Sequence, residues 1–197
     1  MKHIVSFSGG KDSTAMLLMM IEKGMRIDEI IFCDTGLEFD EVYEYIYKIE
    51  KFIGRKIIVL KPDSTFDDWF YGKWTRGIHK AEQRGFPYKK DPCYWTRESK
   101  VKTADKFIGK NIRYLGIAYD EQHRIQNINT YKYPLIYWKM TEQDCKNYLI
   151  KLNLLNPLYK YFDRLGCYLC PRQPLKSFHA IYKYFPKEWN KIRKRRK

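Results

Sequence analysis

Short apolar runs alternate with segments of helical periodicity through the first part of the chain. The runs lie at 3–5, 30–32, 56–60 and 112–117 and have the length of β-strands. We expect the run at 56–60 to form a short buried strand. Between the first three runs, apolar residues recur every three or four positions, which predicts helices that end at Gly24 and Gly54. Strands that alternate with helices indicate an α/β fold with a parallel, Rossmann-like sheet.

The periodicity breaks over 64–92, where aromatic and basic residues mix without a clear period. Such a segment suits nucleotide bases and phosphates, and it is equally compatible with an irregular, partly packed connection. Beyond it we expect a helix over 94–107, and Thr141 with Asp144 has the pattern of a helix-capping box. We expect a single domain over 1–197, in which a nucleotide-binding core (1–135) precedes a helical C-terminal region (136–197).

A glycine-rich turn directly follows the first apolar run. Its two glycines let a ligand approach the backbone closely, and the lysine after them adds a mobile positive charge. The helix that begins next has free N–H groups and a positive dipole end, which together bind anions. An ordinary tight turn explains the glycines alone, but a phosphate-binding loop better explains the full octet, which is Ser6, Phe7, Ser8, Gly9, Gly10, Lys11, Asp12 and Ser13. Its spacing differs from that of a Walker A motif.

Further residues that could contact a ligand lie at the ends of later apolar runs. They are Asp34, Thr35 and Gly36 after the second run, and Gly116, Glu121 and Arg124 at and after the fourth. Ligands of parallel sheets bind at the carboxyl ends of the strands, so we expect these residues at the same edge as the loop. For Glu121 and Arg124, a surface ion pair is the plain alternative.

The octet SFSGGKDS resembles the pyrophosphate loop of the adenine-nucleotide α-hydrolase (ATP pyrophosphatase, PP-loop) superfamily, and Asp34-Thr35-Gly36-x-x-Phe39 narrows this to the PAPS reductase-like branch. The resemblance implies that the loop and the residues at the ends of the second and fourth runs bind ATP or an adenylyl sulfate. Lys11, Asp12 and Arg124 would then be catalytic, with Mg²⁺ held by Asp12 or Asp34. Members either split ATP between the α and β phosphates to adenylylate a substrate, or reduce an adenylyl sulfate to sulfite.

Two of the five cysteines form the turn Cys167-x-x-Cys170. Such a pair can ligate zinc or an iron–sulfur cluster, or act as a redox disulfide. The segments 134–144, 156–159 and 166–171 are similar to the C-terminal half of the same branch, whose cluster-bearing members add an upstream cysteine pair. Here only Cys93 matches that pair. The resemblance thus favours a [4Fe–4S] cluster on Cys93, Cys167 and Cys170, ahead of structural zinc and a bare redox pair.

The remaining cysteines are expected to be structural. Cys145 lies on the apolar face of its helix, and Cys33 ends a buried strand, although it could reach the site. Reductases of the branch carry a nucleophilic cysteine in a C-terminal Glu-Cys-Gly-[Ile/Leu]-His motif, whereas no cysteine follows Cys170 in this sequence. We therefore do not expect a self-sufficient sulfonucleotide reductase.

The composition adds a strong positive charge. The chain has 38 basic and 23 acidic residues, a net charge of +15, with basic residues crowded at 187–197. This favours tRNA or DNA as a partner, or at least an anionic nucleotide. No run approaches the roughly 18 apolar residues of a membrane span, and the first strand leaves no room for a signal peptide, so we expect a cytoplasmic protein without membrane contact.

These observations predict an enzyme, namely an ATP pyrophosphatase that adenylylates an acceptor and acts in sulfur transfer. A base of tRNA or DNA is the favoured acceptor. A sulfur donor or reductant protein is a further expected partner. One alternative is a sulfonucleotide reductase whose thiol is supplied externally or by Cys33. An alternative of another class is a non-catalytic nucleotide or nucleic-acid binding protein. ATP turnover to AMP and pyrophosphate separates this last alternative from the first.

Overall fold

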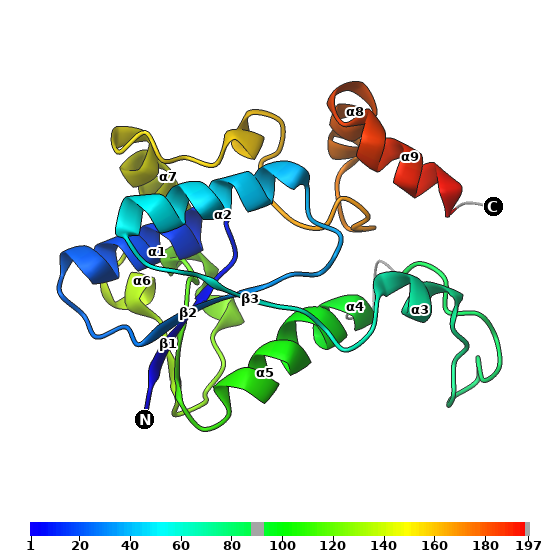
Figure 1. The fold of residues 1–197 in the computed structure, drawn as a ribbon, viewed down its shortest axis with the longest axis horizontal. Coiled ribbons are helices and arrows are strands. Elements are labelled where there is room, and N and C mark those ends of the chain that lie inside the picture. Colours follow the sequence, from blue (N-terminus) through cyan, green and yellow to red (C-terminus); the bar gives the residue numbers. More distant parts are fainter. Residues whose placement is uncertain (88–92, 196–197) are drawn as a thin grey trace.

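The computed structural model describes residues 1–87 and 93–195 and contains a five-stranded sheet in which every neighbouring pair is parallel (Figure 1). The strand order is β3-β2-β1-β4-β5. The strands are β1 (His3–Phe7), β2 (Glu29–Cys33), β3 (Ile58–Leu60), β4 (Ile112–Leu115) and β5 (Tyr131–Lys132). The predicted α/β class with a parallel sheet is therefore confirmed.

Helices cover both faces of the sheet (Figure 1). On one side lie α1 (Lys11–Glu22), α2 (Asp40–Ile53), α6 (Pro134–Tyr137) and α7 (Glu142–Lys151). On the other side, α4 (Tyr94–Thr96), a π-helical stretch (Arg97–Lys102) and α5 (Thr103–Ile108) follow one another. Farther out lie α3 (Phe66–Tyr71), α8 (Leu175–Tyr184) and α9 (Pro186–Lys194), and two 3₁₀ turns span Tyr119–Arg124 and Pro157–Lys160.

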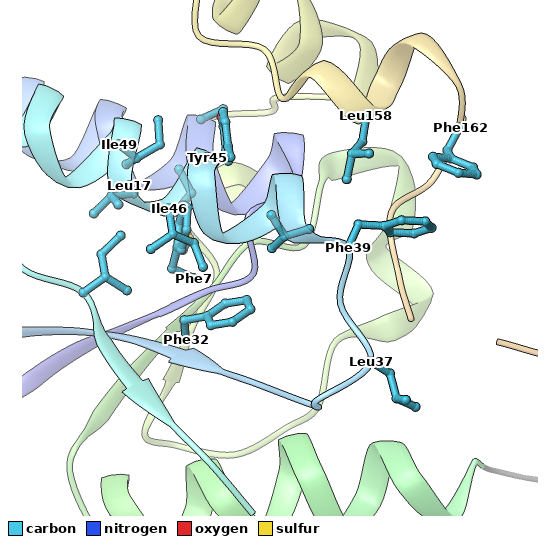
Figure 2. Packing of buried hydrophobic residues seen from close by; sticks show 14 of the residues in the cluster. Phe7, Leu17, Phe32, Leu37, Phe39, Tyr45, Ile46, Ile49, Leu158 and Phe162 are labelled. Carbon is cyan, nitrogen blue, oxygen red and sulfur yellow. The ribbon is translucent and has the colours of Figure 1, made fainter. Parts of the chain in front are cut away.

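The core has two parts because side chains of a strand point alternately to the two faces of a sheet. On one face, Phe7 and Phe32 pack with Leu17 of α1 and Ile49 of α2 (Figure 2). On the opposite face, a smaller cluster joins residues of β1 and β2 to α5; it contains Ile4, Ile31, Ala104 and Ile108. The two clusters hold β1 and β2 rigidly, and the phosphate loop follows directly from β1.

Local sequence signals place several element boundaries correctly. Gly24 and Gly54 both adopt positive φ just after α1 and α2, as the predicted helix ends require. Thr141 and Asp144 form the predicted capping box at the start of α7. The helix expected over 94–107 is present as α4, the π-helical stretch and α5.

Three segments differ in structure from what the sequence pattern indicated. Only Ile58–Leu60 of the run at 56–60 forms a strand, and it is not buried, because β3 lies at the sheet edge and Val59 is 45% exposed. The segment 64–92 is not wholly irregular, since Thr65 and Asp68 cap the short helix α3. Of the apolar run at 112–117, only Ile112–Leu115 forms a β-strand.

The C-terminal helices are joined to the rest of the molecule by aromatic packing. Phe39, which precedes α2, contacts the rings of Phe162 and Phe185 with centroids 5.1 and 4.9 Å apart. Tyr168 packs edge-on against the same ring at 6.1 Å. Within the described part of the chain, none of the helices combines the length and apolar character that crossing a membrane requires.

Candidate functional site

The predicted phosphate loop connects β1 to α1 and is closed by its own hydrogen bonds. Gly9 has a φ of +73°, a conformation that suits glycine, and α1 begins at Lys11. The Ser13 hydroxyl accepts a hydrogen bond from the Ser8 N–H (3.1 Å) and donates one to the Gly10 carbonyl (3.1 Å). The N-cap residue is Gly10, which has no side chain to cap the helix, and the N–H groups and dipole at such a helix start favour an anion.

Two residues of the C-terminal region hold the loop from outside. The Asn156 side-chain amide donates to the Gly9 carbonyl (3.0 Å), and the Tyr159 hydroxyl accepts from the Lys11 backbone N–H (2.9 Å). Asn156 is only 1% exposed. The sequence analysis did not assign these two residues to the site, although the segment 156–159 was among those that resemble the family.

Gly116 brings the end of β4 against the start of α1. A Cβ atom at this position would lie 2.7 Å from Ser13 Cα and 2.8 Å from Ser13 N, which is closer than any real packing allows. Only a glycine fits without displacing the phosphate loop. Gly116 thus lies beside the loop.

Charged side chains gather beside the loop. Lys11 Nζ lies 3.3 Å from an Asp12 carboxylate oxygen and 3.2 Å from one of Glu142. Oxygen atoms of Asp12, Glu121 and Glu142 lie within 4.8 Å of one another, and Arg124 forms an ion pair with Glu121. Burial raises the pKa of Asp12 to about 6, although the nearby Lys11 ammonium opposes the shift. Glu142 was not predicted as a site residue; the capping box of α7 fixes its position.

The three carboxylates suit a divalent cation. Mg²⁺ prefers carboxylate, phosphate and water oxygens, and Asp12 Oδ1 is buried without a hydrogen-bond partner among the described residues. Asp34, the other predicted Mg²⁺ ligand, is not part of this group. Its Oδ1 accepts hydrogen bonds from the Gly36 N–H (2.8 Å) and the Tyr43 hydroxyl (2.7 Å), which shape the turn after β2.

That turn also contacts the cysteine pair. The Thr35 hydroxyl donates to Glu38 (2.9 Å) and lies 3.5 Å from Cys167 Sγ. The backbone N–H of Tyr168 donates to the carbonyl of Leu37 (3.0 Å). Nucleotide contact by Thr35 and Gly36 stays a prediction, and so does contact by Ser6, whose hydroxyl accepts from Arg113 in β4 (2.9 Å).

Of the three predicted metal-binding cysteines, Cys167 has a direct contact with Thr35. Cys93 lies two residues before Trp95, whose indole N–H donates to the Thr35 carbonyl (3.1 Å). Cys170 closes the turn by donating its N–H to the Cys167 carbonyl (3.0 Å). All three are free, partly exposed thiols, and burial, with Glu38 nearby, raises the pKa of Cys167 to about 12.

The sulfur atoms of the described cysteines are not gathered into one compact group. A mononuclear zinc site brings its sulfur ligands within about 4 Å of one another. Among the described residues, the cysteines do not form a group of three ligand atoms within 4.8 Å. A [4Fe–4S] cluster spaces its thiolates more widely because each binds a different iron atom. Cys145 is 0% exposed in the core, and Cys33 Sγ faces the Lys100 carbonyl at 3.6 Å.

Within the aromatic and basic segment 64–92, several large side chains of the described part pack against one another. The Arg84 guanidinium lies 4.4 Å from the Trp69 ring centroid and 5.5 Å from that of Trp74. In the basic tail, Arg195 forms a two-pronged ion pair with Asp67 of α3, at 2.7 and 2.9 Å. Arg196 and Lys197 at the end of the tail, and residues 88–92, lie outside the described part of the chain.

Comparison with known proteins gives one family. Residues 2–173 match the model of the phosphoadenosine phosphosulfate reductase domain. An uncharacterized protein of Methanocaldococcus jannaschii is 29% identical over 206 residues, covering 95% of this chain and 40% of that protein. Adenosine 5'-phosphosulfate reductase 1 of Bacillus subtilis is 29% identical over 171 residues, covering 79% of this chain and 67% of that protein. The chain thus spans less than half the length of its archaeal relative.

A solved structure gives the same fold. The phosphoadenylyl-sulfate reductase of Candida auris, crystallised as a phosphate complex, superimposes with a TM-score of 0.57 at 18% identity. The alignment covers 85% of this chain and 82% of that one. At this identity the comparison establishes the fold.

Proposed function

The chain belongs to the phosphoadenosine phosphosulfate reductase family of the adenine-nucleotide α-hydrolase superfamily, and within it we propose an ATP pyrophosphatase that adenylylates an acceptor during sulfur transfer. The observation that carries this proposal is the phosphate loop, with Lys11 and three carboxylates directly beside it. That arrangement supports splitting a nucleotide at its phosphates.

In the proposed reaction, the N–H groups at the start of α1 bind the β and γ phosphates of ATP. A phosphate oxygen that reaches the Lys11 N–H replaces the Tyr159 hydroxyl, which accepts that hydrogen bond in the free protein. An acceptor oxygen then attacks the α phosphorus, and the bond to the bridging oxygen breaks. The electron pair leaves with pyrophosphate, and Lys11 and Arg124 offset the charge that develops there.

Asp12, Glu121 and Glu142 would hold Mg²⁺, which supplies Lewis-acid polarisation of the phosphate oxygens. With its pKa near 6, Asp12 is ionised at neutral pH and can act as a ligand. Lys11, already within 3.3 Å of two of these carboxylates, keeps their mutual repulsion low.

A metal centre on the cysteines is the second part of the proposal. Cys93, Cys167 and Cys170 are free thiols, Cys167 contacts Thr35, and we favour a [4Fe–4S] cluster over zinc on these three residues. Such a cluster has one iron without a cysteine ligand, where a sulfide for transfer can bind. Serine at any of the three should abolish bound iron after anaerobic purification, while Cys145→Ser should retain it. Iron that persists in Cys93→Ser would contradict this ligand set.

The test of the main proposal is the release of AMP and pyrophosphate from ATP and Mg²⁺, with unfractionated tRNA or duplex DNA as candidate acceptors. Lys11→Ala should lower the rate at least tenfold, while the exposed control Lys110→Ala should not. Nucleotide binding without turnover under any of these conditions would instead support a non-catalytic nucleotide or nucleic-acid binding protein.

A sulfonucleotide reductase is the second candidate, favoured by the similarity to the adenosine 5'-phosphosulfate reductase of Bacillus subtilis. For this candidate we propose Cys33, or a thiol supplied externally, as the attacking group. Sulfite release from an adenylyl sulfate, with thioredoxin as the only reductant, would favour this candidate over the pyrophosphatase.

A further inference from the structure

A hairpin of residues 72–85 follows α3 and extends away from the sheet (Figure 1). Backbone hydrogen bonds pair its two sides: Trp74 N–H to the Glu82 carbonyl (2.9 Å), Ala81 N–H to the Trp74 carbonyl (2.8 Å) and Arg84 N–H to the Gly72 carbonyl (2.9 Å). Residues 75–80 form the tip between these bonds. The hairpin is therefore an ordered projection, which we call the finger.

The base of the finger is anchored firmly. Arg84 packs over Trp69 of α3 and Trp74, and the ring of Tyr94 stacks on Trp69 with centroids 5.7 Å apart. The Tyr94 hydroxyl donates to the Gly85 carbonyl (2.6 Å). The aromatic residues of this segment are thus used to hold the finger in place, which leaves the tip to contact other molecules.

The tip combines an apolar side chain with unpaired cations. Ile78 is 93% exposed, the highest value among the large apolar side chains of the described residues. Arg76 and Lys80 flank it two positions away on either side, and both are exposed. Neither forms an ion pair with a described residue, whereas His79 between them pairs with Glu82 (2.9 Å).

Building on the proposed nucleic-acid acceptor, we propose that the finger docks that acceptor, with Ile78 contacting a base and Arg76 and Lys80 contacting the flanking phosphates. An apolar side chain between basic ones is the arrangement with which proteins press against or between bases while neutralising the backbone. The net charge of +15 agrees with a polyanionic partner. In addition, the Arg195–Asp67 ion pair fixes the basic helix α9 to α3, at the base of the finger.

The test is a titration of labelled unfractionated tRNA and of duplex DNA by fluorescence anisotropy, at about 50 and 200 mM salt. Ile78→Ser should weaken binding about five- to tenfold at both salt concentrations, because it removes an apolar contact and no charge. The double variant Arg76→Ala/Lys80→Ala should weaken binding mainly at low salt and reduce the slope of log K against log salt by roughly 1.4–1.8, since each lost phosphate contact removes about 0.7–0.9.

Matched controls lie elsewhere on the surface. Ile150→Ser removes an isoleucine of α7 that is 53% exposed, and Lys56→Ala/Lys110→Ala removes the same charge as the double variant. Both should bind nucleic acid as the unmodified protein does. Pyrophosphate release from ATP alone should be unchanged in all four variants, because none of these residues touches the phosphate loop.

The outcomes separate this inference from the proposed function. If the unmodified protein binds nucleic acid and the finger variants bind equally well, the finger proposal is overturned and the acceptor proposal stands. If nothing binds at low salt, both are overturned, while ATP turnover still tests the pyrophosphatase. If the finger variants change only the sedimentation of the protein by itself, the tip is a protein contact and the proposal is wrong.

Discussion

Replacing Gly116 with alanine should damage the phosphate loop more than any other single methyl group added to a glycine beside it. The new Cβ would lie 2.7 Å from Ser13 Cα and 2.8 Å from Ser13 N, whereas carbon contacts are ordinarily about 3.5–4.0 Å. The end of β4 and the start of α1 must therefore separate by about 1 Å. Because both neighbours are backbone atoms, no side-chain rotation relieves the contact, and overpacking of this kind costs about 1–3 kcal/mol of unfolding free energy.

The same shift moves the N–H donors of the loop. A misplacement of about 1 Å can reduce activity by roughly a hundredfold, so we expect nucleotide affinity in Gly116→Ala to fall at least tenfold. Urea denaturation and calorimetric titration with ATP measure the two effects. Gly166→Ala is the matched control, because nothing lies within 4 Å of its new methyl group and its φ is not positive. Unchanged stability and ATP affinity in Gly116→Ala would refute the close approach of β4 to the loop.

Three further predictions concern residues around the site. Asn156→Ala should lower the unfolding free energy by about 1–3 kcal/mol and weaken ATP binding, because the buried Gly9 carbonyl loses its partner. Urea denaturation and ATP titration measure the two effects. A variant with the stability and ATP affinity of the unmodified protein would contradict a role of this hydrogen bond in holding the loop. Burial raises the pKa of Asp12 to about 6 in the folded protein, above its ordinary value of 3.8, so the folded state binds this proton more tightly than the unfolded chain. Stability should therefore fall as the pH rises from about 4 to 6, and Asp12→Asn should reduce that fall in urea denaturation at several pH values; an identical pH profile would disprove the assignment. Arg195→Ala should lower the unfolding free energy by about 1 kcal/mol and make α9 easier to cleave in limited proteolysis, since it removes the ion pair to Asp67, while Arg193→Ala should do neither.

The strand, loop and helix at the start of the chain could be predicted because their signals are local. Gly9 and the helix ends at Gly24 and Gly54 each need positive φ, and the sequence places glycine there. The capping box at Thr141 is likewise read within four residues. Such signals depend on neighbours along the chain and not on the fold.

The errors arise where the outcome depends on distant contacts. The run at 56–60 is as apolar as a central strand, but β3 lies at the edge of the sheet that the described residues form, and the sequence does not reveal this position. The helix α3 was missed although Thr65 and Asp68 form a capping box, because the aromatic residues after it obscure its period.

The sequence predicted the part of the site that lies at the strand ends, but not the part that the C-terminal region contributes. The loop octet and Glu121 could be placed at strand ends, but Glu142, Asn156 and Tyr159 reach the loop from helices and turns more than a hundred residues away. Their contacts follow from the packing of the C-terminal region on the sheet. No local pattern shows which of its polar side chains face inward.

The strand order has a consequence for the synthesis of the protein. β1 is made first yet lies in the centre of the sheet, and its pairing with β4 joins His3 to Ile112. The hydrogen bond from Asn156 to Gly9 spans 147 residues. At about 5–20 residues per second, roughly 7–30 s separate the translation of these two residues. β4 follows β1 by about 109 residues, so for roughly 5–22 s one edge of β1 has no partner strand, which exposes the nascent chain to aggregation. The phosphate loop gains its contact with Asn156 only when the C-terminal region has emerged.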